Sequence, residues 1–115
     1  MDEEQSVSAT SRASAVAIAS KAVAAFCRPT LTADAWLSAL KPDLTADAAS
    51  AYATVLPDRV PCHRLTGAVS PTGGDGFTQT IRVPTDAGIC LVLAQRPDDH
   101  TPWRVGRIVL PGRDR

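Results

Sequence analysis

The sequence lacks the features that define several large classes of protein. Its twelve acidic and twelve basic residues cancel, so no net charge attracts a nucleic acid non-specifically. No wholly apolar run exceeds six residues, as in residues 22–27, whereas a membrane-spanning helix needs ~20. We therefore expect neither a nucleic-acid partner nor a membrane span in this chain.

The first four residues, Met-Asp-Glu-Glu, do not have the basic segment with which a secretory signal begins. Taken as written, the sequence leads us to expect a cytoplasmic protein. A soluble domain excised from a membrane-anchored protein would look the same, so the compartment is not assigned.

Cysteine is scarce and shows no motif. Cys27, Cys62 and Cys90 are widely spaced and odd in number, which indicates neither a zinc site nor a disulfide framework. At most one disulfide can form, with one thiol left over. We expect instead three small buried apolar residues in a reducing compartment, and we expect no metal and no cofactor.

Glycine is absent from the first 66 residues, and all seven glycines follow, whereas sixteen of the nineteen alanines precede residue 54. Alanine is the best helix former and glycine one of the worst, so the halves predict helices and then strands. That order is typical of an α+β domain with helices on one face of an antiparallel sheet. We expect one such domain over residues 11–111, between frayed tails at 1–10 and 112–115.

The first half predicts three helices. Apolar residues at three- and four-residue steps predict a helix over residues 11–27. The pentapeptide Leu-Thr-Ala-Asp-Ala then occurs at 31–35 and at 44–48. In each copy the threonine is a typical N-cap and the aspartate complements the positive end of a helix. These signals predict helices over residues 33–41 and 46–55.

In the second half the apolar period changes to two, which predicts strands. A weak strand over residues 63–70 is joined to a strand over 76–83 by a turn-rich hairpin loop. In the latter strand Phe77, Ile81 and Val83 alternate with polar residues, so one face of the strand is expected to be buried and the other to be exposed to solvent.

The last two expected strands each have one irregularity. Residues 89–94 are apolar on both parities, which indicates a central strand or a second face covered by a partner. In residues 103–110 the apolar parity changes at Gly106, which predicts a β-bulge there. The expected fold is therefore three helices packed on one face of a curved four-stranded antiparallel meander.

This order resembles the nuclear-transport-factor-2-like (cystatin-like) superfamily over most of residues 11–110. The local phrases that carry the likeness are Ala25-Phe26, Trp36-Leu37-x-x-Leu40-x-Pro42, Leu44-Thr45, Pro61 with Leu65-Thr66-Gly67, and Trp103-Arg104-Val105. More narrowly, they look like small actinobacterial domains that usually follow a membrane anchor, some of them assembly modules of conjugative-transfer machinery. The resemblance implies a cone whose open end holds a ligand in some members, but it implies no particular activity.

Few side chains are candidates for a site, and we assign no catalytic residue. The weak cavity candidates are His63, Gln79, Tyr52, Trp36 and Trp103. Burying an amide without partners costs ~1–3 kcal/mol, so Gln79 is expected to hydrogen-bond inside or to line a pocket. The two tryptophans are expected to be core anchors first, and His100 to be a solvated residue of a polar turn.

Two functional hypotheses follow. The first is a non-catalytic assembly domain that forms a homodimer through its sheet or binds other protein subunits. Its interface candidates are Ile89, Cys90, Leu91, Val92, Leu93 and Ala94. The second is a small-molecule-binding or enzymatic domain, in which His63, Gln79 and Tyr52 converge on one cavity that takes a small apolar ligand.

Overall fold

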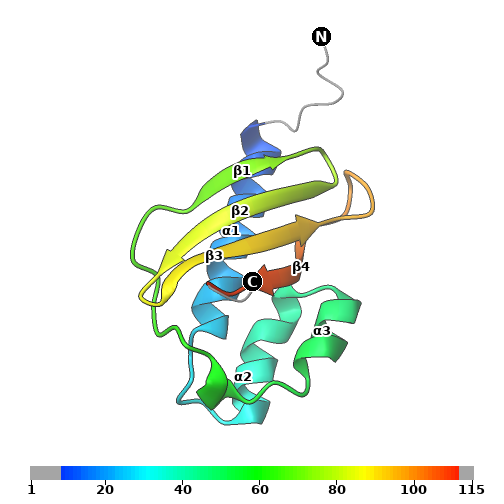
Figure 1. Ribbon diagram of the computed structural model, residues 1–115. Helices are drawn as coiled ribbons and strands as arrows, with labels where there is room; N and C mark the ends of the chain where they lie inside the picture. The colour runs from blue at the N-terminus through cyan, green and yellow to red at the C-terminus, as the bar shows by residue number, and fades with distance from the viewer. Residues whose placement is uncertain (1–8, 112–115) are drawn as a thin grey trace.

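The computed structural model describes residues 9–111, in which three helices precede a four-stranded antiparallel sheet (Figure 1). The helices are α1 (Ala9–Phe26), α2 (Ala33–Leu40) and α3 (Ala46–Tyr52), with short 3₁₀ turns at Lys41–Asp43 and Pro57–Arg59. The strands are β1 (Ser70–Gly74), β2 (Thr78–Thr85), β3 (Gly88–Gln95) and β4 (Arg104–Val109), side by side in that order. The predicted α+β class and the order of elements are confirmed.

The expected tails at 1–10 and 112–115 lie almost wholly outside the described residues. Ala9 and Thr10 are the exception, because both are in α1. Within residues 9–111, no helix is long and apolar enough to cross a membrane.

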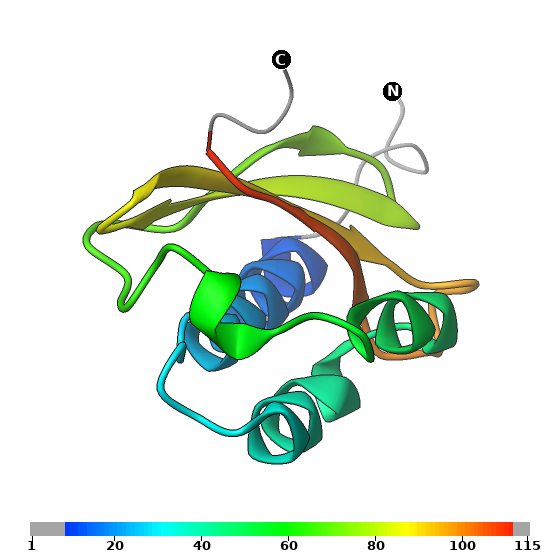
Figure 2. The same cartoon turned by 60° about the horizontal axis from the view of Figure 1, so that its bottom comes forward.

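The three helices lie on one face of the sheet, and the described residues leave its other face uncovered (Figure 2). Helix α1 packs against β2, β3 and β4, α2 packs on α1, and α3 lies beside β4. The two short helices begin as predicted: Thr32 Oγ1 accepts the N–H of Ala35, and Thr45 Oγ1 accepts that of Ala48.

The first strand lies further along the chain than predicted. Residues 63–69 make only a single bridge to the sheet, Leu65 with Thr85, and the regular strand is Ser70–Gly74, inside the predicted loop. The carbonyl of Pro84 points toward residues 63–70 and accepts the N–H of Thr66. Because proline offers no N–H on that same side, the ladder is not continued there.

Phe77 was expected to face the core and is instead exposed. Asp75 Oδ1 accepts the N–H groups of both Phe77 and Thr78, so the chain is still turning at residue 77 and β2 begins at Thr78. Gly74 is needed in this turn, because its φ is +135° and a Cβ there would collide with the carbonyl oxygen of Thr78. Ile81 and Val83 are buried as predicted.

The predicted bulge at Gly106 is confirmed. Leu93 is opposite Arg107 and Ala94 is opposite Val105, so Gly106 is the extra residue on β4. The bulge restores the inward parity of β4, and both Val105 and Ile108 are buried.

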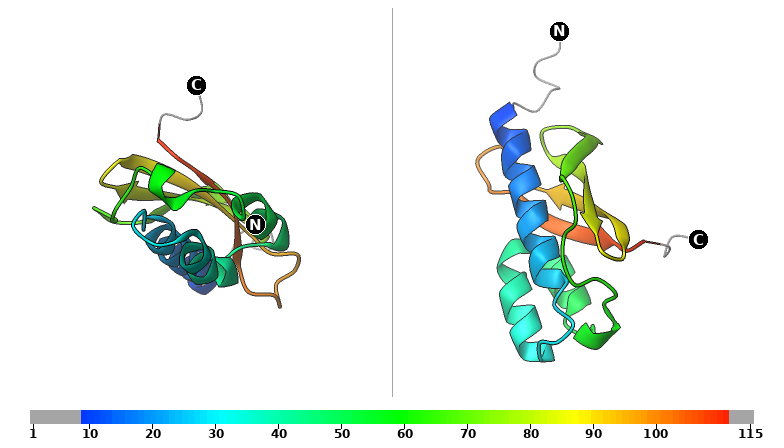
Figure 3. Two further views of the ribbon diagram at one scale, coloured as in Figure 1. Left: turned by 90° about the horizontal axis from the view of Figure 1, so that it is seen from below. Right: turned by 90° about the vertical axis from the view of Figure 1, so that its left-hand side faces the viewer.

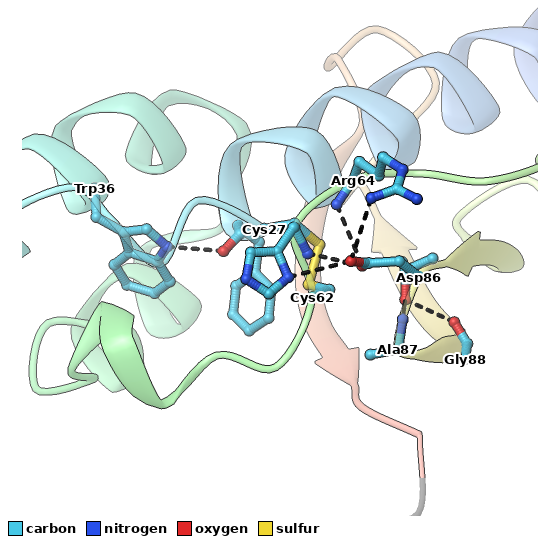
Figure 4. The surroundings of a disulfide bond; sticks show 10 residues. Cys27, Trp36, Cys62, Arg64, Asp86, Ala87 and Gly88 are labelled. Carbon is cyan, nitrogen blue, oxygen red and sulfur yellow. Dashed lines mark hydrogen bonds and ion pairs between the residues drawn. A yellow bond between two sulfur atoms is a disulfide. The ribbon is translucent and has the colours of Figure 1, made fainter.

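A disulfide joins Cys27 to Cys62, whereas three free thiols were expected (Figure 4). Cys27 directly follows α1, and the segment that leads to the sheet returns to this end of the helix, with the two Cα atoms 4.9 Å apart. The 35-residue separation gave no sequence signal for this contact. Cys90 is the free thiol, and it is buried as expected.

Candidate functional site

The central strand β3 has a covered face and an uncovered one. Cys90, Val92 and Ala94 point into the core and are fully buried. Ile89 and Leu91 point outward and are exposed, and the exposed fraction of Leu91 is 39%. Leu93, two residues further along the strand, also points outward and is half-buried. Of the six expected interface residues, only the three outward ones are therefore accessible to a partner.

The strand register groups apolar side chains around these three residues. On β2, Pro84 is opposite Ile89, and on β4, Val109 is opposite Leu91. We call Pro84, Ile89, Leu91, Leu93 and Val109 the outer apolar patch. It lies over the three strands β2, β3 and β4 on the face that no described helix covers.

The charged residues on the three strands of the outer apolar patch are all positive. Arg82 is opposite Leu91 on one side, and Arg107 is opposite Leu93 on the other, and both are exposed. The four strands contain no aspartate and no glutamate. The outer face is therefore an apolar strip between two arginines.

His63 lies away from this face, in a polar cluster beside the disulfide. Its Nδ1 is 3.1 Å from Asp86 Oδ2, and Asp86 Oδ1 accepts the N–H groups of His63 and Arg64 (Figure 4). The backbone hydrogen bond from His63 is the largest of the effects that lower the pKa of the Asp86 carboxyl. The His63 side chain is 62% exposed, so the cluster lies at the surface. Its contacts connect the β2–β3 turn to the segment after Cys62.

The other two members of the expected triad have separate partners. The Gln79 amide is buried and donates to the carbonyl of Asp75 at 2.8 Å, as expected for a polar residue on the inward parity. It also lines a cavity of about 290 Å³ beside β1, which neither His63 nor Tyr52 lines. The Tyr52 hydroxyl accepts the N–H of Ile108 at 2.9 Å, next to the bulge of β4. The structure thus does not bring His63, Gln79 and Tyr52 together.

The tryptophans are core anchors. Trp36 is fully buried, donates its indole N–H to the carbonyl of Phe26 at 2.9 Å, and has its ring centroid 5.5 Å from that of Phe26. Trp103 is also buried and donates to Ser11 Oγ at 3.3 Å. Trp103 borders a cavity of about 670 Å³ between α1 and the loop that joins β3 to β4.

Sequence reasoning missed Arg96, which lines the same cavity. Its guanidinium carbon is 4.4 Å from the centroid of the Trp103 ring, and its Nε donates to the carbonyl of Gly76 at 2.7 Å. Gly76 is 20 residues away, and Trp103 is reached only across the loop that joins β3 to β4, so no local pattern marks Arg96. His100 in the neighbouring loop is exposed, as expected for a turn residue.

Asp43 is a second residue that the sequence did not single out. Its carboxylate is buried, with Oδ1 3.5 Å from Lys21 Nζ. Oδ2 has no hydrogen-bond partner among the described residues. The ion pair ties the turn after α2 to the middle of α1.

Within residues 9–111, no group of three or more His, Cys, Asp or Glu side chains could hold a metal ion. No family model, curated protein or solved structure matches this chain. The functional argument therefore rests on the outer apolar patch and on the contacts described above.

Proposed function

We propose that this protein is a non-catalytic assembly domain that binds protein partners through the outer face of its sheet, with a second copy of the chain as its simplest partner. The observation that carries the proposal is the pair Ile89 and Leu91, exposed on the inner strand β3, whose opposite face is buried in the core. Contiguous apolar surface of this kind is typical of protein–protein contacts.

Energetics favour burying this surface. Covering an aliphatic side chain completely contributes ~1.5–3 kcal/mol, and the outer apolar patch offers several such side chains in adjacent strands. Association must still overcome the loss of translational and rotational freedom. A weak, concentration-dependent dimer that joins the patches of two copies is therefore the expected form.

The arginines give this dimer a diagnostic dependence on salt. Each copy brings Arg82 and Arg107 to the contact, and its strands bring no carboxylate. Like charges across an interface oppose association, and salt screens them. A dimer joined through this face is expected to tighten as salt is added, whereas a complex with an acidic partner would weaken.

We also propose that the domain belongs to the nuclear-transport-factor-2-like superfamily and is an accessory part of a conjugative-transfer or secretion-type system. The helix-then-strand order supports the family, and the Cys27–Cys62 disulfide supports the setting. Disulfides persist in oxidising compartments, where anchored assembly modules of that kind work.

Light scattering on a concentration series, at low and at high salt, tests the proposed association. The average mass is expected to rise with concentration toward that of a dimer, and to rise at lower protein concentration when salt is added. A protein that stays monomeric throughout the micromolar range at both salt concentrations would overturn self-association through the sheet.

A further inference from the structure

The cavity of about 670 Å³ beside Trp103 has the size and lining of a ligand site, and it lies away from the outer apolar patch. Binding pockets for small molecules commonly enclose ~300–1,000 Å³ and combine an apolar surface with a few polar groups. One wall is α1, with Ala17 and Ile18, and the opposite wall is the β3–β4 loop with Trp103. Figure 3 (right) shows this loop beside α1.

Arg96 presents a fixed positive charge to this cavity. Its Nε bond to Gly76 and its position over the Trp103 ring hold the guanidinium plane in place. Within residues 9–111, its terminal amino groups make no ion pair and no hydrogen bond. A planar guanidinium with free amino groups is the preferred protein partner of a carboxylate.

A second arginine lines the same space. Arg104 donates one amino group to the carbonyl of Trp103 at 3.2 Å and makes no ion pair within the described residues. Of the other charged groups in the lining, Lys21 is paired with Asp43, and the exposed Asp99 lies 3.4 Å from His100, a contact that is an ion pair only when the histidine is protonated. Two arginines of the lining therefore have no ion pair within the described residues, and Asp99 is the one carboxylate among the described lining residues.

We propose that this cavity binds a small amphiphilic carboxylate. The carboxylate binds Arg96 and Arg104, and the apolar body lies against Ile18 and the edge of Trp103. Arg96 and Arg104 also line an adjoining cavity of about 540 Å³ on the side of Phe77. The ligand is placed in the cavity beside α1 because this cavity is larger than the adjoining one and is lined by aliphatic side chains of the helix.

Octanoate is a suitable probe because it combines a carboxylate with an alkyl chain. Acetate is the control that has the carboxylate without the long chain, and 1-octanol is the control that has the chain without the charge. Titration into isotope-labelled protein is expected to shift the amide signals of Ala17 and Ile18 and the indole signal of Trp103 at millimolar or lower octanoate. Octanoate is expected to bind at least tenfold more tightly than either control. Equal binding of acetate or 1-octanol, shifts centred on Phe77, or no shifts at all would each overturn the proposal.

A pair of helix variants tests the site without touching the arginines. Ala17 and Ala24 are both exposed on α1, but only Ala17 lines the cavity. Ala17→Glu places a like charge beside the ligand carboxylate and is expected to weaken octanoate binding about tenfold. Ala24→Glu is the matched control and is expected to change the affinity less than twofold. Equal effects of the two substitutions would contradict binding at this cavity.

A second pair tests the charge directly. Arg96→Gln removes the free guanidinium, and Arg107→Gln removes an arginine from the outer face of the sheet. Octanoate affinity is expected to fall about tenfold in Arg96→Gln and to stay within twofold in Arg107→Gln. Unchanged affinity in a folded Arg96→Gln protein would overturn the role of this residue. Because association is measured separately, failure of this site leaves the proposed dimer standing.

Discussion

Both faces of the strand β3 are apolar, but their surroundings differ. Cys90, Val92 and Ala94 are covered by helices, whereas Ile89, Leu91 and Leu93 meet no described helix. The inward residues stabilise the domain by packing in its core, and the outward ones are accessible to a protein partner. The inward side chains of β3 therefore stabilise the fold, and in our proposal its outward side chains bind a partner.

The largest expected effect contrasts these faces within two adjacent positions. Val92→Asp buries an unpaired charge and is expected to cost about 3–5 kcal/mol, a large part of the ~5–15 kcal/mol that stabilises an ordinary domain. Leu91→Asp places the same carboxylate in solvent and is expected to change the free energy of unfolding by about 0.5 kcal/mol or less. Denaturation in urea measures both, and similar losses in the two variants would erase the contrast.

The covered side is also expected to depend on its disulfide. Replacing Cys27 and Cys62 by alanine releases a 35-residue loop and is expected to lower the free energy of unfolding by about 4 kcal/mol on the loop-entropy model. Leu91→Asp in the same background should again change the free energy of unfolding by about 0.5 kcal/mol or less. If the double variant unfolds at the same urea concentration as the wild type, the disulfide does not stabilise this fold.

Cys90 reports whether the inner face of β3 stays closed. Burial raises the pKa of its thiol, which further disfavours the reactive thiolate. A thiol reagent is therefore expected to label Cys90 only after the protein is unfolded. Rapid labelling of the native protein would mean that the covered face opens easily.

A smaller effect is expected at the edge of the sheet near β4. Tyr52→Phe removes the acceptor of the Ile108 N–H and keeps the ring, which lies 6.0 Å from the Phe26 ring between centroids. The expected loss is about 1–2 kcal/mol in the free energy of unfolding. An unchanged urea midpoint would show that this hydrogen bond is replaced by water.

The smallest effect is on the pH dependence of stability. Because the folded pKa of Asp86 lies below its ordinary value of about 3.8, its contribution is complete above that pH and is lost as the pH falls through the folded value. Asp86→Asn is expected to be less stable than the wild type near neutral pH and to lose less stability on acidification. Parallel acid-unfolding curves for the two proteins would contradict the role of Asp86.

Local signals in the sequence predicted much of this fold. The caps at Thr32 and Thr45 depend on three-residue contacts, and the bulge at Gly106 is visible as a change of apolar parity, so both were predicted correctly. The strand Ser70–Gly74 was missed because it is an exposed edge strand without apolar alternation, and only its pairing with β2 makes it a strand.

Contacts between distant residues explain what sequence reasoning could not reach. Cys27 meets Cys62 only because the chain returns to the end of α1, and Arg96 meets Trp103 only across a folded loop. For β3, the sequence predicted an apolar strand but not which parity the helices cover. Which side chains of β3 the helices cover decides which of them belong to the core and which to the outer apolar patch.

Sedimentation equilibrium of two matched variants tests the central claim most directly. Leu91 is 39% exposed within the outer apolar patch, and Leu56 is 54% exposed outside the sheet. Self-association is expected to disappear in Leu91→Asp and to remain at the wild-type level in Leu56→Asp. Wild-type association in Leu91→Asp, or an equal loss in both variants, would contradict assembly through the outer face of the sheet.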